Sequence, residues 1–246
     1  MSPAPWRAPA GTRRGALATA LLAVALVGGC ASTGTGVARD PLEPMNRAVF
    51  TFNDQVDALL VRPAARAYQT VVPEVLRIAI GNVIGNLLEP WSVLNQLLQG
   101  KPLEAVSSAA RFGLNTTLGL AGVVDIATPI GLERQQEDLG QTLGRWGLPA
   151  GPYLVLPLLG PSSLRDATGT IGSYRLDPVW HSADGDLRGA FTLFFVLESR
   201  VRLLGAERVI EGAALDRYSF IRDSYLQRRR NLVFDGNPPP PKEDDE

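Results

Sequence analysis

The sequence has little of the residue types on which catalysis and cross-linking usually depend. It contains one cysteine, Cys30, and one histidine, His181, in 246 residues. A single thiol excludes internal disulfides and cysteine-rich zinc sites. The chain also lacks the Gly-x-Ser-x-Gly signature of a lipase-type nucleophile and the glycine-rich loop that binds nucleotide phosphates. We therefore expect no enzyme activity, no catalytic residue, no metal site and no cofactor.

A strong excess of charge of one sign is missing as well. The chain has 24 basic and 25 acidic residues, and three of the basic residues lie among the first 14 positions. The rest of the chain is therefore mildly acidic. This balance gives no general attraction to nucleic acid or to anionic lipid, so nucleic acid is not an expected partner.

The N-terminus has the features of an exported lipoprotein. A positive segment is followed by an uncharged apolar run, 16–27, and by the sequence Val27-Gly28-Gly29-Cys30. This order is typical of a secretory signal, and the run is shorter than the roughly 20 residues of a membrane span. The cysteine after small residues resembles a bacterial lipobox, although Gly28 stands where such motifs usually carry Ala or Ser.

We therefore expect a signal peptide at 1–29 and a lipid anchor, with diacylglycerol and palmitate, on Cys30. The alternative is an ordinary signal peptide with an incidental cysteine. The residue after the cysteine is not aspartate, which by resemblance to bacterial lipoprotein sorting indicates the outer membrane. Small and polar residues then predict a flexible tether over 30–39. At the other end, prolines and acidic residues predict a disordered tail over 233–246.

The segment 40–232 predicts an all-α domain of short helices interrupted by proline. Asp40-Pro41-Leu42-Glu43 has the pattern of a helix start in which Asp40 caps the helix and Glu43 bonds back to the cap amide. Breaks are expected at Arg62-Pro63, Val72-Pro73 and Glu89-Pro90. The remaining elements are listed here in order: helices near 91–98 and 102–118, a turn or hairpin at 119–131, helices near 135–145, 187–211 and 215–230, and an irregular uncharged stretch at 146–164.

These helices have more apolar faces than a small soluble bundle needs. Three explanations fit the pattern: a compact bundle, burial of the helices by a partner, or exposure of their apolar sides to lipid. Periodicity alone favours the bundle.

The sequence resembles the MlaA/VacJ family of lipoproteins. The motifs that carry the resemblance are, in order, Asp40-Pro41-Leu42-Glu43 with Asn46-Arg47, Phe52-Asn53, Arg62-Pro63, Asn86-Leu87 with Glu89-Pro90, Leu98-Gln99-Gly100, Arg111-Phe112 with Asn115-Thr116, Gly140-Gln141-Thr142-Leu143-Gly144, Gly151-Pro152-Tyr153, Leu164-Arg165-Asp166, and Tyr218 to Arg228. They extend over about 40–230 at family spacing.

The resemblance implies a ring of short amphipathic helices that lies in the inner leaflet of the outer membrane, on the periplasmic side, around a central amphipathic channel. Phospholipids that have strayed into the outer leaflet would pass through this channel to a periplasmic carrier for return transport, which maintains lipid asymmetry. Trimeric outer-membrane porins would hold the ring. The alternative function is a structural adaptor that tethers porins or a periplasmic partner without moving lipid.

Several residues are candidates for these roles. Phe52 and Asn53 lie in a dense part of the motif and are expected to help gate the channel, while Gly119, Gly122 and Gly131 are expected to act as hinges. The alternatives are an ordinary core phenylalanine with a solvated asparagine, and plain turn chemistry.

A second set of candidates concerns partners. By resemblance, 139–155 faces the porin, and its candidate contact residues are Gly140, Gly144, Gly147, Gly151 and Tyr153. Small residues permit close backbone approach, either to a partner or within the protein. The candidate headgroup contacts are Arg222, Arg228 and Arg229, although such a basic run is more often a solvated face. A phospholipase would have to use His181.

Overall fold

The computed structural model describes residues 40–176, 184–213 and 216–240. Cys30, His181 and the last six residues lie outside the described part of the chain. The described residues belong to one unit, Asp40–Pro240. Its elements are α2 (Glu43–Val56), the π-helix η1 (Asp57–Val61), α3 (Arg62–Val71), α4 (Glu74–Leu98), α5 (Pro102–Thr117), the 3-10 helix η2 (Thr128–Ile130), α6 (Leu139–Arg145), β1 (Tyr153–Leu156), β2 (Gly160–Ser163), α7 (Leu164–Leu176), α9 (Gly185–Ala213) and α10 (Arg217–Val233).

Helix α2 begins at Glu43, two residues after the predicted first helical position Pro41, and Leu42 rather than Asp40 occupies the N-cap position. The Asp40 carboxylate accepts hydrogen bonds from the amide of Leu42 at 3.0 Å and from Asn46 Nδ2 at 2.9 Å, and another from the Tyr218 hydroxyl. Glu43 pairs with Arg47 at 2.7 Å rather than returning to the cap amide. Asp40 therefore ties the entry of the chain to α10, a role that the local pattern does not display.

Two of the three expected proline breaks are absent. Pro63 lies in the first turn of α3, where its missing N–H is tolerated, and η1 leads into α3 without interruption. Pro90 lies inside α4, which continues to Leu98 because polar side chains on both sides of it are bound to neighbouring elements. Pro73 does break the chain: it caps α4, and the path from α2 and α3 into α4 bends by 118°.

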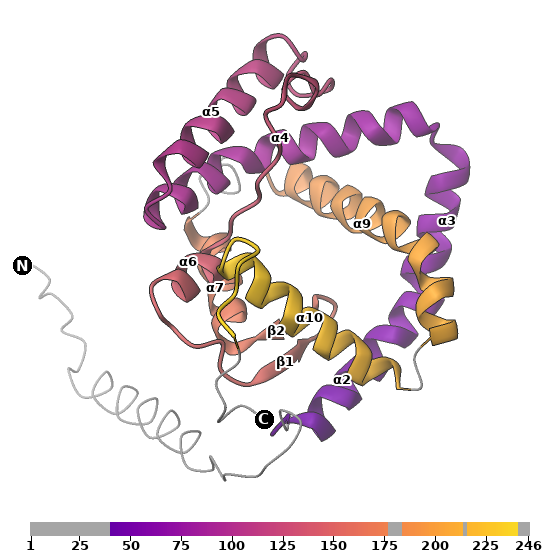
Figure 1. Ribbon diagram of the computed structural model, residues 1–246. Coiled ribbons are helices and arrows are strands. Elements are labelled where there is room, and N and C mark those ends of the chain that lie inside the picture. The colour runs from indigo at the N-terminus through magenta and orange to yellow at the C-terminus, as the bar shows by residue number, and fades with distance from the viewer. Residues whose placement is uncertain (1–39, 177–183, 214–215, 241–246) are drawn as a thin grey trace, which may run out of the picture. The chain divides into compact units, whose positions relative to one another are not determined.

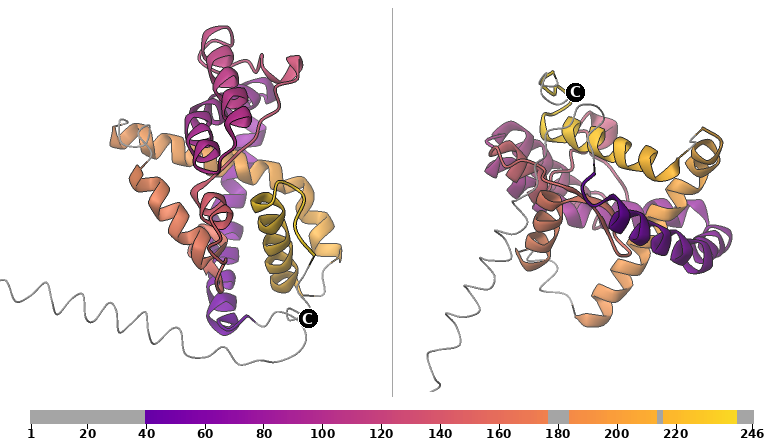
Figure 2. Two further views of the ribbon diagram at one scale, coloured as in Figure 1. Left: turned by 60° about the vertical axis from the view of Figure 1, so that its left-hand side comes forward. Right: turned by 90° about the horizontal axis from the view of Figure 1, so that it is seen from below.

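The elements of this unit follow one another around a closed circuit, which Figure 1 shows face on. From α2 the chain passes through η1 and α3 to α4, which packs against α5 and α6. Helix α6 packs on α7, α7 adjoins β2, and β1 packs on α2 and so closes the circuit. Helix α9 lies along α3 and α4, and α10 contacts α6 and β2. The other views show α7 and the first turns of α9 projecting to the same side (Figure 2).

The uncharged stretch 146–164 contains a β-hairpin that the sequence pattern does not predict. Strands β1 and β2 pair antiparallel, with Tyr153 opposite Ser163 and Leu156 opposite Gly160. Two asparagines of α2 hold the hairpin: Asn46 Nδ2 donates to the Tyr153 carbonyl at 2.9 Å, and Asn53 Nδ2 donates to the Leu156 carbonyl at 2.9 Å. The all-α class is confirmed for the rest of the unit, and α7 is a further helix that the pattern does not reveal.

The distribution of polar and apolar side chains is the reverse of that in a soluble protein, and we call this inverted polarity. The largest fully buried side chains among the described residues are all polar: Arg111, Gln96, Glu89, Asn46, Asn95, Asn115, Thr142, Ser108 and Ser163. Large apolar side chains on nearly every helix are exposed, among them Leu59, Leu60, Val71, Val75, Leu76, Leu97, Leu103, Val106, Leu118, Trp146, Leu193 and Leu203. The compact soluble bundle that periodicity favours is therefore wrong, because the apolar faces point outward.

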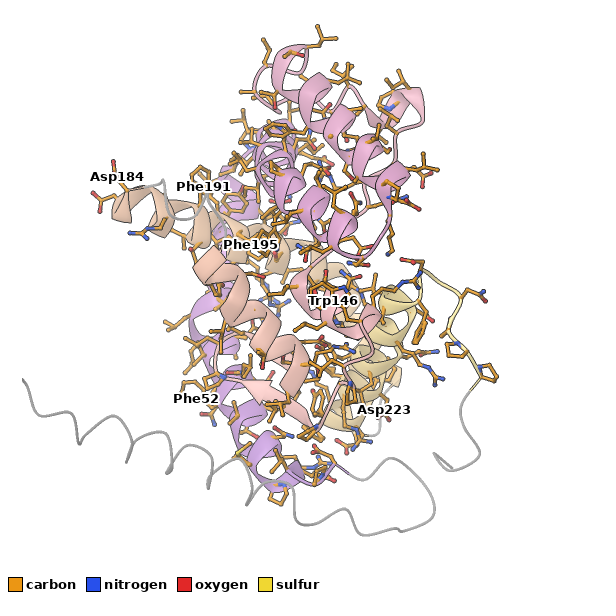
Figure 3. The ribbon with its side chains drawn as sticks, turned by 90° about the vertical axis from the view of Figure 1, so that its left-hand side faces the viewer. Phe52, Trp146, Asp184, Phe191, Phe195 and Asp223 are labelled. Atoms are coloured by element: carbon orange, nitrogen blue, oxygen red, sulfur yellow. The ribbon has the colours of Figure 1, made fainter. Side chains whose placement is uncertain are left out.

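The first turns of α9 also carry exposed apolar side chains, among them Leu193 and Phe195. They project from the other helices with Asp184 at the tip and Phe191 and Phe195 behind it (Figure 3). Within the described residues, no helix is by itself long and apolar enough to cross a membrane, although one strongly bent pair, Glu43–Val71 with Glu74–Leu98, reaches that length and composition together.

Candidate functional site in the polar interior

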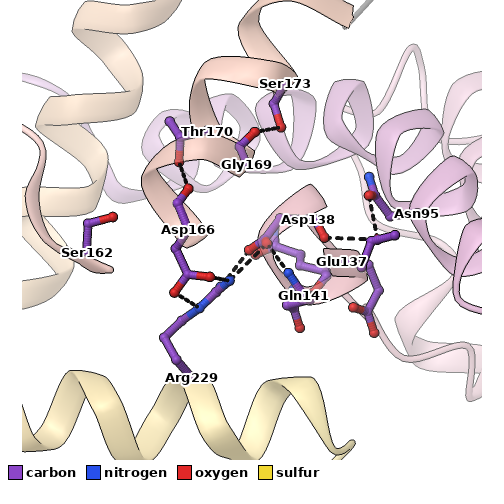
Figure 4. A network of polar contacts seen from close by, with 12 residues as sticks. Asn95, Glu137, Asp138, Gln141, Ser162, Asp166, Gly169, Thr170, Ser173 and Arg229 are labelled. Carbon is purple, nitrogen blue, oxygen red and sulfur yellow. Dashed lines mark hydrogen bonds and ion pairs between the residues drawn. The ribbon is translucent and has the colours of Figure 1, made fainter. Parts of the chain in front are cut away.

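The best-defined polar group, here called the aspartate–arginine cluster, consists of Asp138, Asp166, Tyr225 and Arg229. Figure 4 shows how the two aspartates meet Arg229. Arg229 of α10 bridges two elements: its Nη1 lies 2.6 Å from Asp138 Oδ2, and its Nη2 lies 2.9 Å from Asp166 Oδ1. Tyr225, one turn earlier, donates its hydroxyl to Asp166 Oδ2 at 2.7 Å. Asp138 also caps α6 by accepting from the amide of Gln141 at 2.8 Å.

The charges in this cluster are strongly coupled. Burial would raise the pKa of Asp138 and Asp166, but hydrogen bonds and the positive charge of Arg229 outweigh burial and lower the pKa of both carboxyls. Burial would lower the pKa of Arg229, and the two aspartates raise it instead. Burial, followed by the hydrogen bond to Asp166, raises the pKa of Tyr225. At neutral pH the cluster therefore holds two carboxylates and the guanidinium of Arg229, and a second guanidinium, that of the buried Arg165, lies 3.0 Å from Asp166 Oδ1.

A cavity of about 150 Å³ adjoins this cluster. Its wall consists of the four cluster residues together with Pro161, Ser162, Gly169, Thr170 and Ser173. A space of this size with hydroxyl and carboxylate groups on its wall holds several water molecules. It can accept a polar or charged group without the cost of placing that group in hydrocarbon.

A second polar group joins the end of α4 to α6 and to the chain after α10. Thr142 donates to Asn95 Oδ1 at 2.8 Å, and the buried Lys101 donates to Glu137 Oε1 at 3.0 Å. Lys101 also forms an ion pair with Asp235. The expectation of disorder from residue 233 is therefore wrong for this part of the tail, because Asp235 is held by a buried cation.

The third polar group surrounds Arg111 of α5, which has no exposed surface. Its Nε lies 3.2 Å from Glu89 Oε1, and its Nη2 lies 3.3 Å from Asp125 Oδ2. Burial would raise the pKa of Asp125, but hydrogen bonds from Thr128 and Asn115 and the charge of Arg111 lower it. This group fixes the loop after α5 against α4 and α5.

Phe52 and Asn53 have different surroundings although they are adjacent. The Phe52 side chain is 49% exposed. Asn53 is fixed to the hairpin, because its Oδ1 also accepts from the amide of Leu158 at 2.8 Å. Asn53 is therefore only partly exposed, and movement of α2 against the hairpin would break its two hydrogen bonds as well as those of Asn46.

The candidate hinge glycines fall into two kinds. Gly122 and Gly131 have φ of +89° and +90°, a left-handed conformation that favours glycine. A Cβ on Gly122 would lie 2.7 Å from Asn86 Cβ, whereas a Cβ on Gly131 would meet nothing within 4 Å. Gly119 is needed for close packing, since its Cβ would lie 2.2 Å from the Val124 carbonyl oxygen.

The residues expected to face a porin are also divided. A Cβ on Gly140 would lie 2.6 Å from Asp166 Oδ1, and one on Gly144 would lie 2.7 Å from Arg165 Nη1, so the close approach at both glycines is within the protein. Gly147 and Gly151 are exposed and have positive φ. The expectation for Tyr153 is wrong: its ring is buried between α2 and α10, and burial raises its pKa to about 12.

The three candidate headgroup arginines do not form one basic face. Arg222 is buried, with its Nε 2.8 Å from Asp223 Oδ1, and Arg229 is bound to two aspartates. Only Arg228 of the three is exposed. The three arginines therefore do not act as one free basic run, because Asp138 and Asp166, far away in the sequence, pair with Arg229, and headgroup contact by these arginines stays a prediction.

The polar residues of α4 and α5 were missed as site residues, although a signal for them exists in the sequence. Within the apolar segment that forms α4 and its C-cap, polar side chains recur every three to four residues, at Asn86, Glu89, Ser92, Asn95 and Gln99, and all five are buried. A polar stripe on an otherwise apolar helix indicates that the polar face is the protected one. In the described part of the chain, no three His, Cys, Asp or Glu side chains gather as the ligands of a metal ion would.

The sequence and the fold of this chain are both similar to those of known proteins. The family model described as "MlaA lipoprotein" matches residues 38–232. Proteins named "Intermembrane phospholipid transport system lipoprotein MlaA" from Shigella flexneri and Escherichia coli K12 are each 36% identical, with 92% of both chains covered. The Haemophilus influenzae protein of that name is 30% identical over 89% of this chain and 90% of its own.

A solved structure, described as "Structural basis for maintenance of bacterial outer membrane lipid asymmetry", has 34% sequence identity to this chain and superimposes with a TM-score of 0.72. The match covers 79% of this chain and 99% of that one.

Proposed function

Because this chain belongs to the MlaA lipoprotein family, we propose that it removes misplaced phospholipids from the outer leaflet of the outer membrane. Acylated Cys30 anchors it to the inner leaflet, on the periplasmic side. Lipid passes through the polar interior to a periplasmic carrier of the same pathway, and trimeric porins flank the protein. The chain itself performs no chemical reaction.

The single observation that carries this proposal is the inverted polarity of the unit 40–240. A charged headgroup at the centre of a bilayer costs several kcal/mol. Side chains such as Glu89, Arg111, Asp138 and Arg229 provide a polar interior, while the exposed apolar exterior suits contact with acyl chains. A protein built in this way lowers the barrier for a headgroup while the tails stay in apolar surroundings.

Specific regions are assigned roles within this proposal. The aspartate–arginine cluster and its cavity form part of the path of the headgroup. Phe52 and the turn that contains Gly119, Gly122 and Gly131 are moving parts at its entrance. The exposed surface of Trp146, Leu148, Gly147 and Gly151 faces the porin, which leaves the packed Gly140 and Gly144 to hold that surface in place.

The test is deletion of the gene in its native host, followed by labelling of intact cells with a membrane-impermeant amine reagent that reaches only outer-leaflet phosphatidylethanolamine. We expect outer-leaflet label to rise on deletion and to return to the wild-type level on complementation. A structural adaptor predicts no rise. Complementation by His181→Ala would exclude a serine–histidine phospholipase, whereas its failure with normal protein levels would contradict a function without catalysis.

A further inference from the structure

Helix α4 carries two buried glycines one turn apart, Gly81 and Gly85, and each lies under an arginine from a different part of the chain. A Cβ on Gly81 would lie 2.9 Å from Arg202 Nη2 of α9, and a Cβ on Gly85 would lie 2.2 Å from Arg134 Nη1. The absence of side chains at these two positions lets both guanidinium groups rest on the surface of α4. Figure 1 shows α9 running beside α4 at this place.

Both arginines have donors that the protein leaves unused. Arg134 Nε lies 3.3 Å from Glu89 Oε1, an oxygen that also lies 3.2 Å from Arg111 Nε, so one carboxylate is shared between two guanidinium groups. Arg134 Nε and Nη2 are buried and form no hydrogen bond of good geometry. A buried donor without an acceptor is rare in native proteins, and here it belongs to a cation beside a glycine notch.

Arg202 is held loosely and remains accessible. Its contact with Glu198 Oε1 is 3.5 Å long, compared with 2.6 Å between Arg229 and Asp138, and its side chain is 66% exposed. A guanidinium has five N–H donors, and a single long contact leaves most of them free. Glu198 and Glu89 balance the charges, so this is not a general basic patch but a pair of guanidinium groups with spare donors.

A tetrahedral phosphate is the acceptor that suits two such groups, since planar guanidinium forks match its oxygens. The exterior side of α4 near these glycines carries exposed Val75, Leu76 and Ile78, which places apolar surface within reach of acyl chains. Resting on the proposed transport function, we propose that Arg134 and Arg202 bind the phosphate of a phospholipid in transit against the Gly81–Gly85 face of α4.

The proposal is tested with the full-length protein in detergent and with dioctanoyl phosphatidylethanolamine, dioctanoyl phosphatidylglycerol and inorganic phosphate as separate probes. Microscale thermophoresis gives the affinity for each. The variants are Arg134→Gln and Arg202→Gln, and the control is Arg66→Gln, because Arg66 is exposed on α3. We expect each site variant to bind both lipids about tenfold more weakly through loss of charge-assisted hydrogen bonds. The control should bind both lipids as the wild type does.

A second pair of variants separates binding from folding. Gly81→Ala and Gly85→Ala introduce a methyl group where a guanidinium now lies, and alanine favours a helix over glycine. We expect Gly81→Ala to keep the wild-type unfolding temperature, because only the end of the flexible Arg202 side chain must move. We expect the same variant to bind both lipids more weakly. Unchanged lipid affinity in both Arg202→Gln and Gly81→Ala would overturn the assignment.

The remaining outcomes decide between ligand sources and between proposals. Equal arginine-dependent affinity for inorganic phosphate and for the lipids would overturn the lipid assignment in favour of a free phosphate site. Wild-type protein that binds neither dioctanoyl lipid would contradict the transport function itself. If all four site variants bound the lipids with the affinity of the wild type, only the role of this arginine pair would be contradicted.

Discussion

Replacing Arg229 with methionine removes the cation that holds two carboxylates together. Its side chain is largely buried, and so is Asp166, while Asp138 is partly exposed. Removing one partner of a buried ion pair costs roughly 3–5 kcal/mol because a charge is left uncompensated. We expect about 3 kcal/mol, the lower end of that range, because solvent screens Asp138. The free energy of unfolding in detergent at pH 7, from denaturant titration, measures the loss.

The pH dependence of this loss is a sharper test. In the wild type the pKa of both aspartates is below its ordinary value of 3.8, so their stabilising effect is present above that value and is lost as the pH falls through the lowered pKa. Without Arg229, Asp138 loses the cation that lowers its pKa and burial raises that pKa, whereas Asp166 keeps its hydrogen bonds from Arg165, so acid relieves the strain mainly at Asp138. The difference in stability between wild type and Arg229→Met should therefore be largest at pH 7 and shrink below about pH 4.

The neighbouring Arg228 provides the matched control, since it is exposed on the same helix. Arg228→Met should change stability by no more than about 0.5 kcal/mol. Adding Asp138→Asn to the Arg229→Met protein should recover part of the loss, because Arg229 is the cation paired with Asp138, although the same substitution alone destabilises the wild type. A loss for Arg229→Met that is the same at pH 7 and pH 4, or no larger than that of Arg228→Met, would refute the reasoning.

Four further substitutions test other parts of the structure. Asn53→Ala should lower stability in detergent by about 1–2 kcal/mol through loss of two hydrogen bonds to the hairpin, and thermal unfolding that is unchanged would contradict that anchoring role. Gly131→Ala should lower stability by about 1 kcal/mol through left-handed backbone strain. Gly122→Ala should lower it distinctly more, because only that substitution also clashes with a side chain. The reverse order in denaturant titration would show that the side-chain clash does not determine the loss of stability. Leu60→Glu, in a Cys30→Ser protein, should reduce flotation with phosphatidylethanolamine–phosphatidylglycerol vesicles without altering its circular dichroism, and undiminished flotation would mean that this surface does not meet lipid.

The sequence correctly predicts those helix ends that depend on residues close to them in the chain. Pro102 begins α5 as expected, and Gly100, with φ of +75°, follows the end of α4. Pro90 was misread as a break for the opposite reason. Its helix is kept continuous by side chains such as Glu89, whose partner Arg111 lies 22 residues away, and such a tertiary contact overrides a local preference.

The hairpin could not be predicted because its supports come from a distant helix. Prolines and glycines in 146–164 indicate irregular backbone, and the pairing of β1 with β2 depends on Asn46 and Asn53, more than 100 residues earlier. The candidate headgroup contacts show the same limit. A basic run reveals that Arg229 is charged, but it does not reveal that Asp138 and Asp166 converge on it.

The inverted polarity reverses the roles that apolar and polar side chains have in a soluble bundle. In such a bundle, buried apolar side chains hold the helices together and polar side chains meet the surroundings. Here, hydrogen bonds and ion pairs around residues such as Arg111 and Asp166 fix the interior, while exposed leucines such as Leu60 and Leu103 meet the surroundings. Interior substitutions should therefore change unfolding in detergent, and exterior ones should change membrane partition.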